Sequence, residues 1–396
     1  MKKESFILFL LAFINFVNIV DVMIIMPLGE VIMTLFEISP GQFSILVSAY
    51  TTAAGVSGFL GVFFIDKLDR KLLLLLALVG FSIGTFACAI STSYLFLVAT
   101  RAFTGLFGGL IGALVLSIVS DVFVMEKRGK AMGILMAAFS VASVIGVPLS
   151  LFLANKFTWQ TPFYFLSVLG LVAFLLALRL PQFKGHILLK AERTRPFKAL
   201  GLMWKDKNQR LALSMGLFLI LGHFSTIPFV TPFMTRNIGF SQEEITYIYL
   251  LGGGFTVFTS PLIGKLTDRF KPLRMFRILI IASFVVTLIL TSLETQSMAV
   301  ALTINTIFFV FVSGRMIPAQ TLITGAVGSS GRGSFMSIKS SLQQLAAAIA
   351  SIIGGLIVVE NADGTIGNYW MVGIFAVVVS SITLFIAPKL RVAKGN

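Results

Sequence analysis

The sequence is poor in charged residues and in cysteine. Asp, Glu, Lys and Arg together supply 12% of the 396 residues, whereas hydrophobic residues supply 57%. A soluble domain carries about 25% charged residues, and a chain this apolar cannot cover a core of ordinary size with polar surface. The single cysteine, Cys88, excludes an intrachain disulfide. These shortages exclude a string of soluble domains and favour a protein with many membrane-spanning segments.

Common enzyme motifs are scarce as well. No Gly-x-x-x-x-Gly-Lys-Ser/Thr loop occurs, and Gly264-Lys265 is followed by leucine, so ATP is not expected as a direct energy source. His-Glu-x-x-His does not occur either, and the one Gly-x-Ser-x-Gly match, Gly80 to Gly84, lies inside the apolar stretch 72–91. A membrane-embedded enzyme would need titratable groups clustered at one membrane face, and the sequence shows no such cluster. We therefore expect no enzyme activity, no metal site and no cofactor.

Twelve stretches of about 20 mostly apolar residues are long enough to cross a bilayer as helices. They are residues 6–30, 42–65, 72–91, 94–120, 131–154, 162–181, 211–235, 245–265, 275–293, 298–324, 334–358 and 369–387. The connections are short except for residues 182–210, which are polar and basic. The sequence predicts an all-α polytopic membrane protein with an N-terminal six-helix bundle (1–181), a basic cytoplasmic linker (182–210) and a C-terminal six-helix bundle (211–396).

The net charge of +15 is distributed unevenly along the chain. An even number of spans places both termini on one side of the membrane, and 27 of the 31 Lys and Arg residues fall on that side. Cations accumulate on the cytoplasmic side of membrane proteins, so we expect both termini in the cytoplasm and the protein in the inner (plasma) membrane of the cell. The excess positive charge then indicates how the protein is oriented in the membrane, so a nucleic-acid partner is not expected.

Two loops in corresponding places of the two halves resemble each other. The loop after the second span contains Asp66 and Arg70, and the loop after the eighth span contains Asp268 and Arg269. An acid followed by cations in the same loop of both halves indicates an internal repeat, and hence two pseudo-symmetric bundles. Each acid can meet a helix N-terminus of the other half, that of span 11 or span 5, and so close the cytoplasmic side. The alternative is a solvated turn held by local charge pairs.

Further motifs resemble a known family. The second loop reads Gly264-Lys-Leu-Thr-Asp268-Arg269, span 4 contains Arg101-Ala-Phe-Thr-Gly105, and span 5 contains Gly146 and Pro148. Over essentially its whole length the chain resembles the major facilitator superfamily, and most of all its twelve-helix drug:proton antiporter branch. The resemblance implies two bundles that rock about a central site for a small-molecule substrate, powered by a proton gradient. We expect a monomer in the lipid bilayer.

Ionisable residues at membrane depth are costly, so each marks a candidate functional site. Asp21 of span 1 shares a helix face with Asn15 and Asn18. Asp21 lies about 22 Å from the start of its span, and Arg101 lies about 10 Å below the outer start of span 4. Because the depths agree, the two side chains can pair. We expect the pair to couple transport to protons, since moving a carboxylate toward or away from an arginine changes its affinity for a proton. A static ion pair is the alternative.

Seven residues are candidates for the substrate cavity. They are Asn18, Tyr50, His223, Tyr247, Arg315, Gln343 and Gln344. Arg315 precedes Pro318 by three residues, where a helix can bend; it can attract an anionic or polar substrate group, or bond to neighbouring carbonyls instead. His223 precedes Pro228 and Pro232, whose spacing indicates a broken or kinked helix. His223 can relay protons or serve as a polar packing group.

The abundance of Phe (39) and Met (15) predicts an apolar, aromatic cavity wall. We therefore expect export of small amphipathic or hydrophobic compounds. An exporter of sugars, amino acids or lipids on the same fold is the alternative, and there Arg315 and the glutamines of span 11 would govern recognition. A channel usually repeats one short pore element across subunits, which does not fit the two-half plan. A transporter-like sensor without flux is excluded only by a transport assay.

Overall fold

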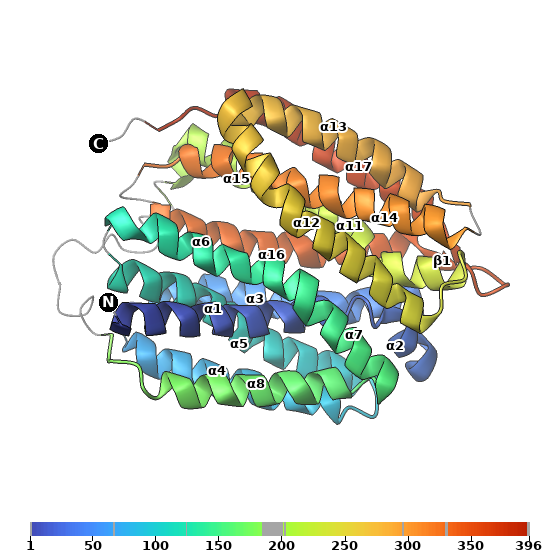
Figure 1. The fold of residues 1–396 in the computed structure, drawn as a ribbon, viewed down its shortest axis with the longest axis horizontal. Coiled ribbons are helices and arrows are strands. Elements are labelled where there is room, and N and C mark those ends of the chain that lie inside the picture. The colour runs from blue at the N-terminus through green and yellow to red at the C-terminus, as the bar shows by residue number, and fades with distance from the viewer. Residues whose placement is uncertain are drawn as a thin grey trace.

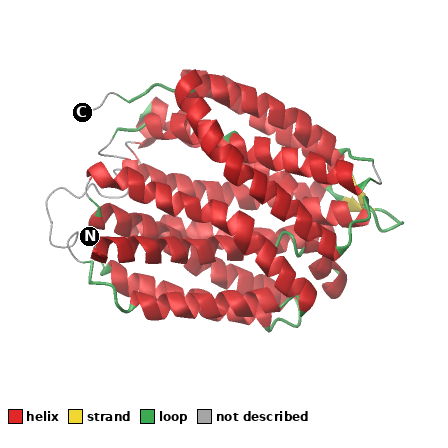
Figure 2. Ribbon diagram, viewed as in Figure 1, coloured by secondary structure: helices red, strands yellow, loops and turns green. Residues whose placement is uncertain are grey.

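The protein is a bundle of long helices, seen in a computed structural model that describes residues 2–65, 68–123, 125–183, 201, 203–294, 297–328 and 332–393. Figure 2 shows that helices make up nearly all of the described chain. Eleven of the described helical segments are long and apolar enough to cross a membrane, and the shorter apolar helix Thr161–Ala177 accompanies them. The twelve predicted spans therefore each correspond to a helical segment.

The described residues of the N-terminal half form eight α-helices and one π-helical segment. They are α1 (Lys2–Ile24), α2 (Gly29–Phe36), α3 (Pro40–Phe64), α4 (Arg70–Ala89), α5 (Tyr94–Val122), α6 (Met125–Val141), the π segment η1 (Ala142–Gly146), α7 (Val147–Lys156) and α8 (Thr161–Ala177). The predicted first span, 6–30, is too long as one helix. The chain leaves the helix after Ile24 and passes Pro27, which cannot donate a backbone hydrogen bond. The short α2 then follows.

The C-terminal half has the same plan with two short strands added. Its elements are α11 (Lys207–Arg236), α12 (Gln242–Phe270), α13 (Pro272–Thr291), α14 (Met298–Gly314), α15 (Met316–Gly325), α16 (Arg332–Ile357), β1 (Val359–Glu360), β2 (Ile366–Gly367), α17 (Tyr369–Ile386) and the 3-10 turn η2 (Ala387–Lys389). The strands pair antiparallel, with Val359 opposite Gly367. Asp363 lies in the hairpin between them, and hydrogen bonds from Thr365 lower the pKa of its carboxyl group.

The two halves repeat each other in how corresponding helices begin. At the start of α3, the Ser39 hydroxyl accepts from the backbone N–H of Gln42 (3.3 Å), and the Gln42 side chain accepts from the backbone N–H of Ser39 (2.9 Å). Ser241 and Glu244 make the same reciprocal cap at the start of α12. Such a cap satisfies two donors that a helix start leaves unpaired. The second helical span of each half is thus fixed at the same end by the same device.

Prolines act differently in two helices of the C-terminal half. The predicted span 298–324 is interrupted at Arg315, since α14 ends at Gly314, four residues before Pro318. By contrast, α11 runs as one helix through Pro228 and Pro232, so a break there is excluded. Pro228 cannot donate to the carbonyl of Phe224, and the Ser351 hydroxyl of α16 donates to that carbonyl instead, at 3.5 Å. An outside donor thus offsets the bond that the proline removes.

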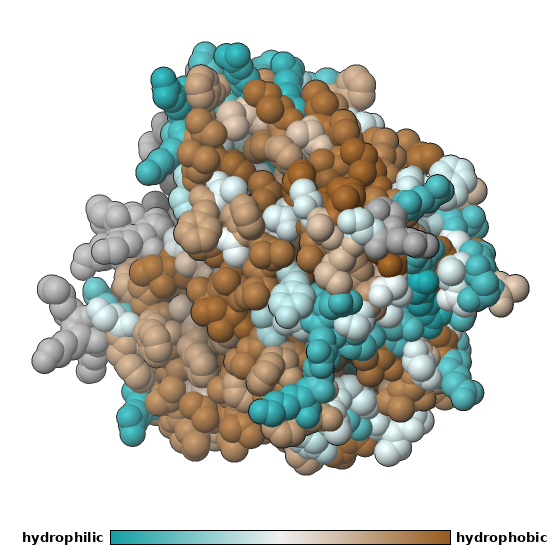
Figure 3. Space-filling model, turned by 45° about the vertical axis from the view of Figure 1, so that its right-hand side comes forward, coloured by the Kyte–Doolittle hydropathy of each residue, from teal (hydrophilic) through white to brown (hydrophobic). Residues whose placement is uncertain are grey.

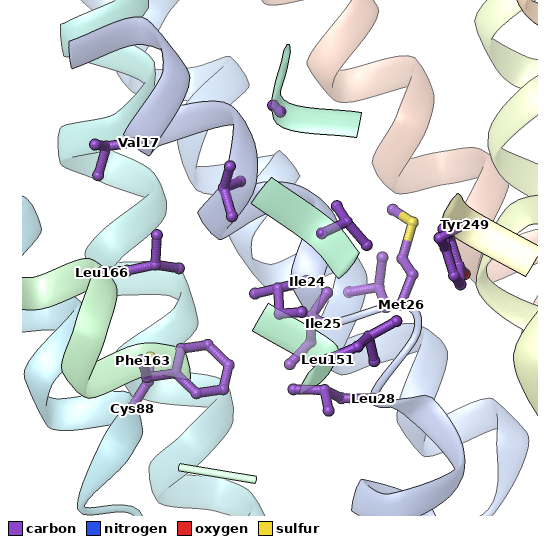
Figure 4. Close-up of a cluster of buried hydrophobic side chains, with 14 of the residues drawn as sticks. Val17, Ile24, Ile25, Met26, Leu28, Cys88, Leu151, Phe163, Leu166 and Tyr249 are labelled. Atoms are coloured by element: carbon purple, nitrogen blue, oxygen red, sulfur yellow. The ribbon is translucent and has the colours of Figure 1, made fainter. Parts of the chain in front are cut away.

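The first and last helices begin and end at the same side of the molecule (Figure 1). We call this side the terminal end and the opposite side the distal end. One apolar core cluster fills the N-terminal half and continues into the distal part of the C-terminal half, through residues such as Phe229, Phe233 and Tyr249. Figure 4 shows part of it, with Met26 from the N-terminal half and Tyr249 from α12. The terminal part of the C-terminal half has a separate cluster that includes Leu219, Phe276 and Phe335. The halves therefore share a core at the distal end and have separate cores at the terminal end.

Large apolar side chains also cover the outside. Leu95, Phe258, Leu356 and Phe385 are among the most exposed of them. Figure 3 shows a broad apolar surface, with hydrophilic residues gathered toward its margins. Helices that present apolar side chains outward and bond their own backbone groups are suited to a lipid environment.

Candidate functional site

A buried ion pair lies at the centre of the N-terminal half. Arg101 Nη1 of α5 lies 2.8 Å from Asp21 Oδ2 of α1, and Arg101 Nη2 donates to the Asp21 carbonyl at 3.2 Å. Both residues have a relative exposure of 0%. The pairing predicted from their matching depths is what the structure shows.

Three more polar side chains surround the pair. The Thr85 hydroxyl of α4 donates to Asp21 Oδ1 at 3.3 Å. The Arg101 guanidinium carbon lies 4.5 Å from the centre of the Tyr50 ring of α3, a distance suited to a cation–π contact. The Tyr50 hydroxyl donates to Asn18 Oδ1 of α1 at 2.9 Å. Helices α1, α3, α4 and α5 thus meet at one connected group of polar side chains, and the cavity candidates Asn18 and Tyr50 belong to it.

Glycines let helices α3 and α5 pack closely beside this group of polar side chains. A Cβ on Gly105 would overlap the backbone of Tyr50, and one on Gly109 would overlap the backbone of Ala54, so only glycine lets α5 lie this close to α3. Gly146, at the end of η1, leaves room for the side chain of Val20 on α1, and Val20 directly precedes Asp21. Pro148 follows in the first turn of α7. The motif glycines Gly105 and Gly146 therefore act by packing helices around Asp21.

The C-terminal half contains a buried cation of a different kind. Arg315, 3% exposed, donates from Nη1 to the hydroxyl of Ser283 on α13 at 2.8 Å. It lines a narrow pocket together with His223 of α11. Within the described residues, neither Arg315 Nε nor His223 Nδ1 has a hydrogen-bond partner. The structure brings these two candidates together, which their positions in the sequence did not predict.

The remaining cavity candidates are less concentrated. Tyr247 is half exposed and shares the outward stripe of α12 with apolar side chains such as Leu251 and Phe258, so it lies apart from the buried groups. Tyr249 is the buried tyrosine of that helix, and its hydroxyl lies 3.1 Å from that of Thr231. Gln343 and Gln344 are half-buried on α16. The Gln343 amide lies beside Gly216 of α11, where it faces the other helices of its own half.

The structure describes three of the four predicted gating residues. Asp66 lies outside the described residues. Arg70 forms an ion pair with Asp121 at the end of α5 and donates to the Ser117 carbonyl at 3.1 Å, both within its own half. Asp268 and Arg269 are exposed at the end of α12, where Arg269 lies over the Phe270 ring. These contacts of Arg70 lie within the N-terminal half, and closure of the cytoplasmic side by the two loops stays a prediction.

Asp69, beside Arg70, has a structural role. Its carboxylate caps α4 by accepting from the backbone N–H of Lys71 at 2.9 Å, and it accepts from the backbone N–H of Phe183 at 3.1 Å. It thereby fastens the start of α4 to the chain that follows α8. An aspartate that caps a helix in this way is a common choice for that position.

A second ionic group, not anticipated from the sequence, joins the two halves at the distal end. Arg236 Nε at the end of α11 lies 2.7 Å from Glu30 Oε2 of α2, and Arg236 Nη1 lies 2.9 Å from Glu360 of β1. Asn155 of α7 adds a bond to the Gln242 carbonyl of α12 at 3.0 Å. We call Glu30, Arg236 and Glu360 the distal triad. Together with the shared core, it closes the distal end.

Known protein sequences resemble this chain over most of its length. The sequence model of the Major Facilitator Superfamily matches residues 11–314 and 213–395. The chain belongs to the major facilitator superfamily. Two MFS-type transporters of Bacillus subtilis (strain 168) are similar to it: YbcL, 24% identical over 81% of this chain and 80% of its own length, and YceJ, 22% identical over 84% of each.

Solved structures share the fold at low identity. A D-xylose-proton symporter superposes with a TM-score of 0.78 at 16% identity, covering 98% of this chain and 99% of its own. A bacterial homolog of the human lysosomal transporter Spinster, in an inward-facing and unoccupied conformation, superposes with a TM-score of 0.74 at 17% identity, covering 97% and 96%. Membership of the family makes this chain a membrane transporter for a small molecule and not an enzyme. Among the described residues, no three His, Cys, Asp or Glu side chains are grouped as a metal site.

Proposed function

We propose that this major facilitator exports small amphipathic or hydrophobic compounds in exchange for protons, as a drug:proton antiporter does. The observation that carries the proposal is the Asp21–Arg101 pair, fully buried where α1, α3, α4 and α5 meet. We further propose that residues 1–181 and 211–396 are the two moving bundles, that 182–210 links them, and that the terminal end faces the cytoplasm at the plasma membrane, with the protein acting as a monomer.

The ion pair is suited to proton coupling because only one partner can change its charge. Arg101 stays protonated under all physiological conditions, so a proton that arrives at Asp21 removes the attraction that joins α1 to α5. Removing one partner of a buried pair costs about 3–5 kcal/mol. A conformational change that opens the site, and so reduces this cost, can therefore be linked to proton binding.

The contacts of the ion pair can transmit a change in the protonation of Asp21 to the surrounding helices. Asp21, Arg101, Tyr50 and Asn18 form one chain of contacts across α1, α3 and α5. Gly146 holds η1 against α1 one residue away. A change in charge at Asp21 therefore acts on helices that also pack against the C-terminal half, since α7 and η1 contact α12.

The arrangement of the two halves supports alternating access. The distal triad and the shared apolar core close the distal end, while the terminal end of the C-terminal half has a core of its own. We infer that this conformation opens toward the cytoplasm, and that transport requires the distal triad to break. The shared fold of a D-xylose-proton symporter supports the idea that such a scaffold accommodates proton coupling.

An exporter of sugars, amino acids or lipids is the second candidate. The partly buried amides of Gln343 and Gln344 favour it, because they offer hydrogen bonds to a polar cargo. Substituting both glutamines by leucine separates the two candidates. Loss of transport of the protein's cargo in this double variant supports the second candidate, whereas transport at the wild-type rate supports the first.

Proton movement in liposomes tests the proposal. The purified protein is reconstituted with a trapped pH indicator, and neutral, cationic and anionic amphiphiles are added one at a time under an imposed proton gradient. We expect proton flux that appears only with particular cargo and is abolished by Asp21→Asn. Asp363→Asn, the same chemical change at an exposed aspartate of the distal hairpin, is the matched control and is expected to keep the flux. Cargo-dependent proton flux of normal rate in Asp21→Asn would overturn the proposal.

A further inference from the structure

The membrane-spanning part of the C-terminal half contains cations but no carboxylate. Residues 211–235, 245–267, 275–293, 298–324, 334–358 and 369–387 include neither Asp nor Glu. All acids after residue 211 lie at helix ends or in loops, as Glu243, Asp268 and Glu294 illustrate. Arg315 nevertheless lies among these segments and is 3% exposed. The C-terminal half therefore supplies no membrane-embedded counter-ion for this guanidinium.

The partner that Arg315 does have is neutral. Ser283 accepts one hydrogen bond from Nη1 at 2.8 Å, and Nε has no partner among the described residues. A hydroxyl satisfies a donor but does not compensate a full charge, and an uncompensated charge in a membrane interior is expensive. Arg101 provides the contrast, since its charge is compensated by Asp21 at 2.8 Å. Arg315 is thus left in a state that an incoming anion would stabilise.

The walls around Arg315 combine polar donors with aromatic surface. The pocket is lined by Arg315 with His223, Thr226 and Thr287, and on its apolar side by Phe284 and Phe308. His223 Nδ1 is buried and has no partner among the described residues. The wall side chains lie so close together that the pocket has no room for a water molecule. A headgroup enters only when the side chains move apart, while an apolar body can lie against the phenylalanines.

A second buried cation lies on the same side of this half. Lys339 of α16 is 5% exposed, and its Nζ donates to Gln320 Oε1 of α15 at 2.5 Å. Gln320 follows Arg315 by five residues, toward the terminal end of α15. Lys339 again has no carboxylate in the membrane-spanning segments of its half. Two buried cations beside α15 make this part of the molecule attractive to a negative charge that approaches from the terminal end.

We propose that the pocket at Arg315 binds the carboxylate of an amphipathic anion, so that cargo of this class supplies the counter-ion that the C-terminal half lacks. Arg315 can bond a carboxylate through two parallel N–H donors. The hydroxyl of Ser283 fixes the guanidinium, and Phe284 and Phe308 contact the apolar part of the molecule. This inference rests on the proposed function, whose cargo it narrows from amphipathic compounds in general to amphipathic carboxylates.

Binding to the purified full-length protein tests the inference without any proton gradient. Thermal unfolding in a non-ionic detergent is followed while 4-phenylbutyrate or its uncharged analogue 4-phenylbutanamide is added, in a buffer of low ionic strength that contains neither chloride nor any other carboxylate. We expect half-maximal stabilisation at a concentration at least about tenfold lower for the acid than for the amide, since hydrogen bonds between charged groups are worth more than neutral ones. Equal concentrations for the two compounds would overturn the inference.

Two substitutions assign the preference to Arg315. Arg315→Gln is expected to bring the acid and the amide to within about twofold of each other, and Arg315→Lys to keep part of the difference because the charge remains. Arg210→Gln, the same chemical change at an exposed arginine near the start of α11, is expected to keep the full preference. Ser283→Ala serves if Arg315→Gln does not fold, and it is expected to weaken acid binding alone. A full preference in Arg315→Gln or, failing that variant, in Ser283→Ala contradicts the assignment.

Two further outcomes separate this inference from its rivals. Stabilisation by chloride equal to that by 4-phenylbutyrate would assign the pocket to an inorganic anion and overturn the inference. Preference for the acid that depends on Arg315, in a protein that moves no protons in liposomes, would support the anion pocket and contradict proton coupling. Failure of one proposal can therefore be told from failure of the other.

Discussion

The two halves of this major facilitator treat buried charge in different ways. In the N-terminal half Arg101 faces a carboxylate, an aromatic ring and the carbonyl of the same aspartate. In the C-terminal half Arg315 bonds to a serine hydroxyl, and the membrane-spanning segments around it hold no Asp or Glu. The same residue type on two related bundles thus ends in a compensated and an uncompensated state. We infer that the first arrangement lets Asp21 take up and release a proton, whereas the second lets Arg315 bind an anion that comes from outside the protein.

The largest expected effect on stability is at the compensated site. Asp21→Asn leaves the Arg101 charge buried without its partner, so we expect the free energy of unfolding to fall by about 3–5 kcal/mol. Adding Arg101→Gln should restore part of the loss, because the uncompensated charge is then gone. Denaturation of the purified protein in detergent measures both. Equal stability of Asp21→Asn and wild type would show that the pair contributes no stability.

Overpacking beside the Asp21–Arg101 pair should have the second-largest effect on stability. Gly105→Ala places a methyl group into the Tyr50 backbone, and overpacking of this kind costs about 1–3 kcal/mol. Gly112→Ala on the same helix is the matched control, because its Cβ meets nothing within 4 Å. There the better helix propensity of alanine should stabilise by about 0.5–1 kcal/mol. The same unfolding assay tests this contrast, and similar effects at the two positions would contradict the packing role of Gly105.

Neutralising the uncompensated charge, Arg315, should not lower the free energy of unfolding as Asp21→Asn does. Arg315→Gln removes a buried charge that has no carboxylate partner in its half, so we expect unfolding free energy within about 1 kcal/mol of wild type, or higher. Comparison with Asp21→Asn in one denaturation series sharpens the difference between halves. A loss as large as that of Asp21→Asn would mean that Arg315 is compensated by the protein itself, and the comparison would fail.

The exposed pair of the distal triad, Arg236 with Glu360, should give the smallest change in stability. The Glu360 side chain is 43% exposed, and exposed ion pairs contribute about 0–1 kcal/mol. Glu30→Gln should instead shift the balance of conformations toward opening of the distal end. A cysteine placed at Asn155, on a background in which Cys88 is replaced by alanine, is expected to react faster with a membrane-impermeant reagent in Glu30→Gln. Glu360→Gln, at the more exposed partner, should accelerate it less, and unchanged rates in both would remove the triad's role in closure.

Much of the fold was accessible from the sequence because it depends on length and hydropathy alone. Each predicted span has its helical segment, and the Asp21–Arg101 contact followed from counting depth along two helices. Counting residues along a helix gives the depth of a side chain in the membrane but not the direction in which it faces. It could not show that His223 and Arg315 line the same pocket, because that depends on how each helix is rotated. It also could not show that Tyr247 faces outward while Tyr249 is buried.

The distal triad escaped prediction for a related reason. Glu30, Arg236 and Glu360 stand at the ends of separate elements, far apart in the sequence, and nothing in their local pattern says that they meet. The boundary at Ile24 was missed because residues 25–28 are as apolar as the helix before them, whereas Pro27 interrupts the backbone bonds. Hydropathy alone does not register that interruption, although the proline was a usable signal.

The central claim is that the compensated charge couples protons and the uncompensated charge selects cargo. Counting protons moved per cargo molecule in liposomes, for wild type, Asp21→Asn and Arg315→Gln, tests it most directly with 4-phenylbutyrate and 4-phenylbutanamide as cargo. We predict that Asp21→Asn still equilibrates cargo down its gradient but moves no protons with it, and that Arg315→Gln keeps proton coupling but no longer favours the acid. Proton coupling lost in Arg315→Gln and kept in Asp21→Asn would contradict the account.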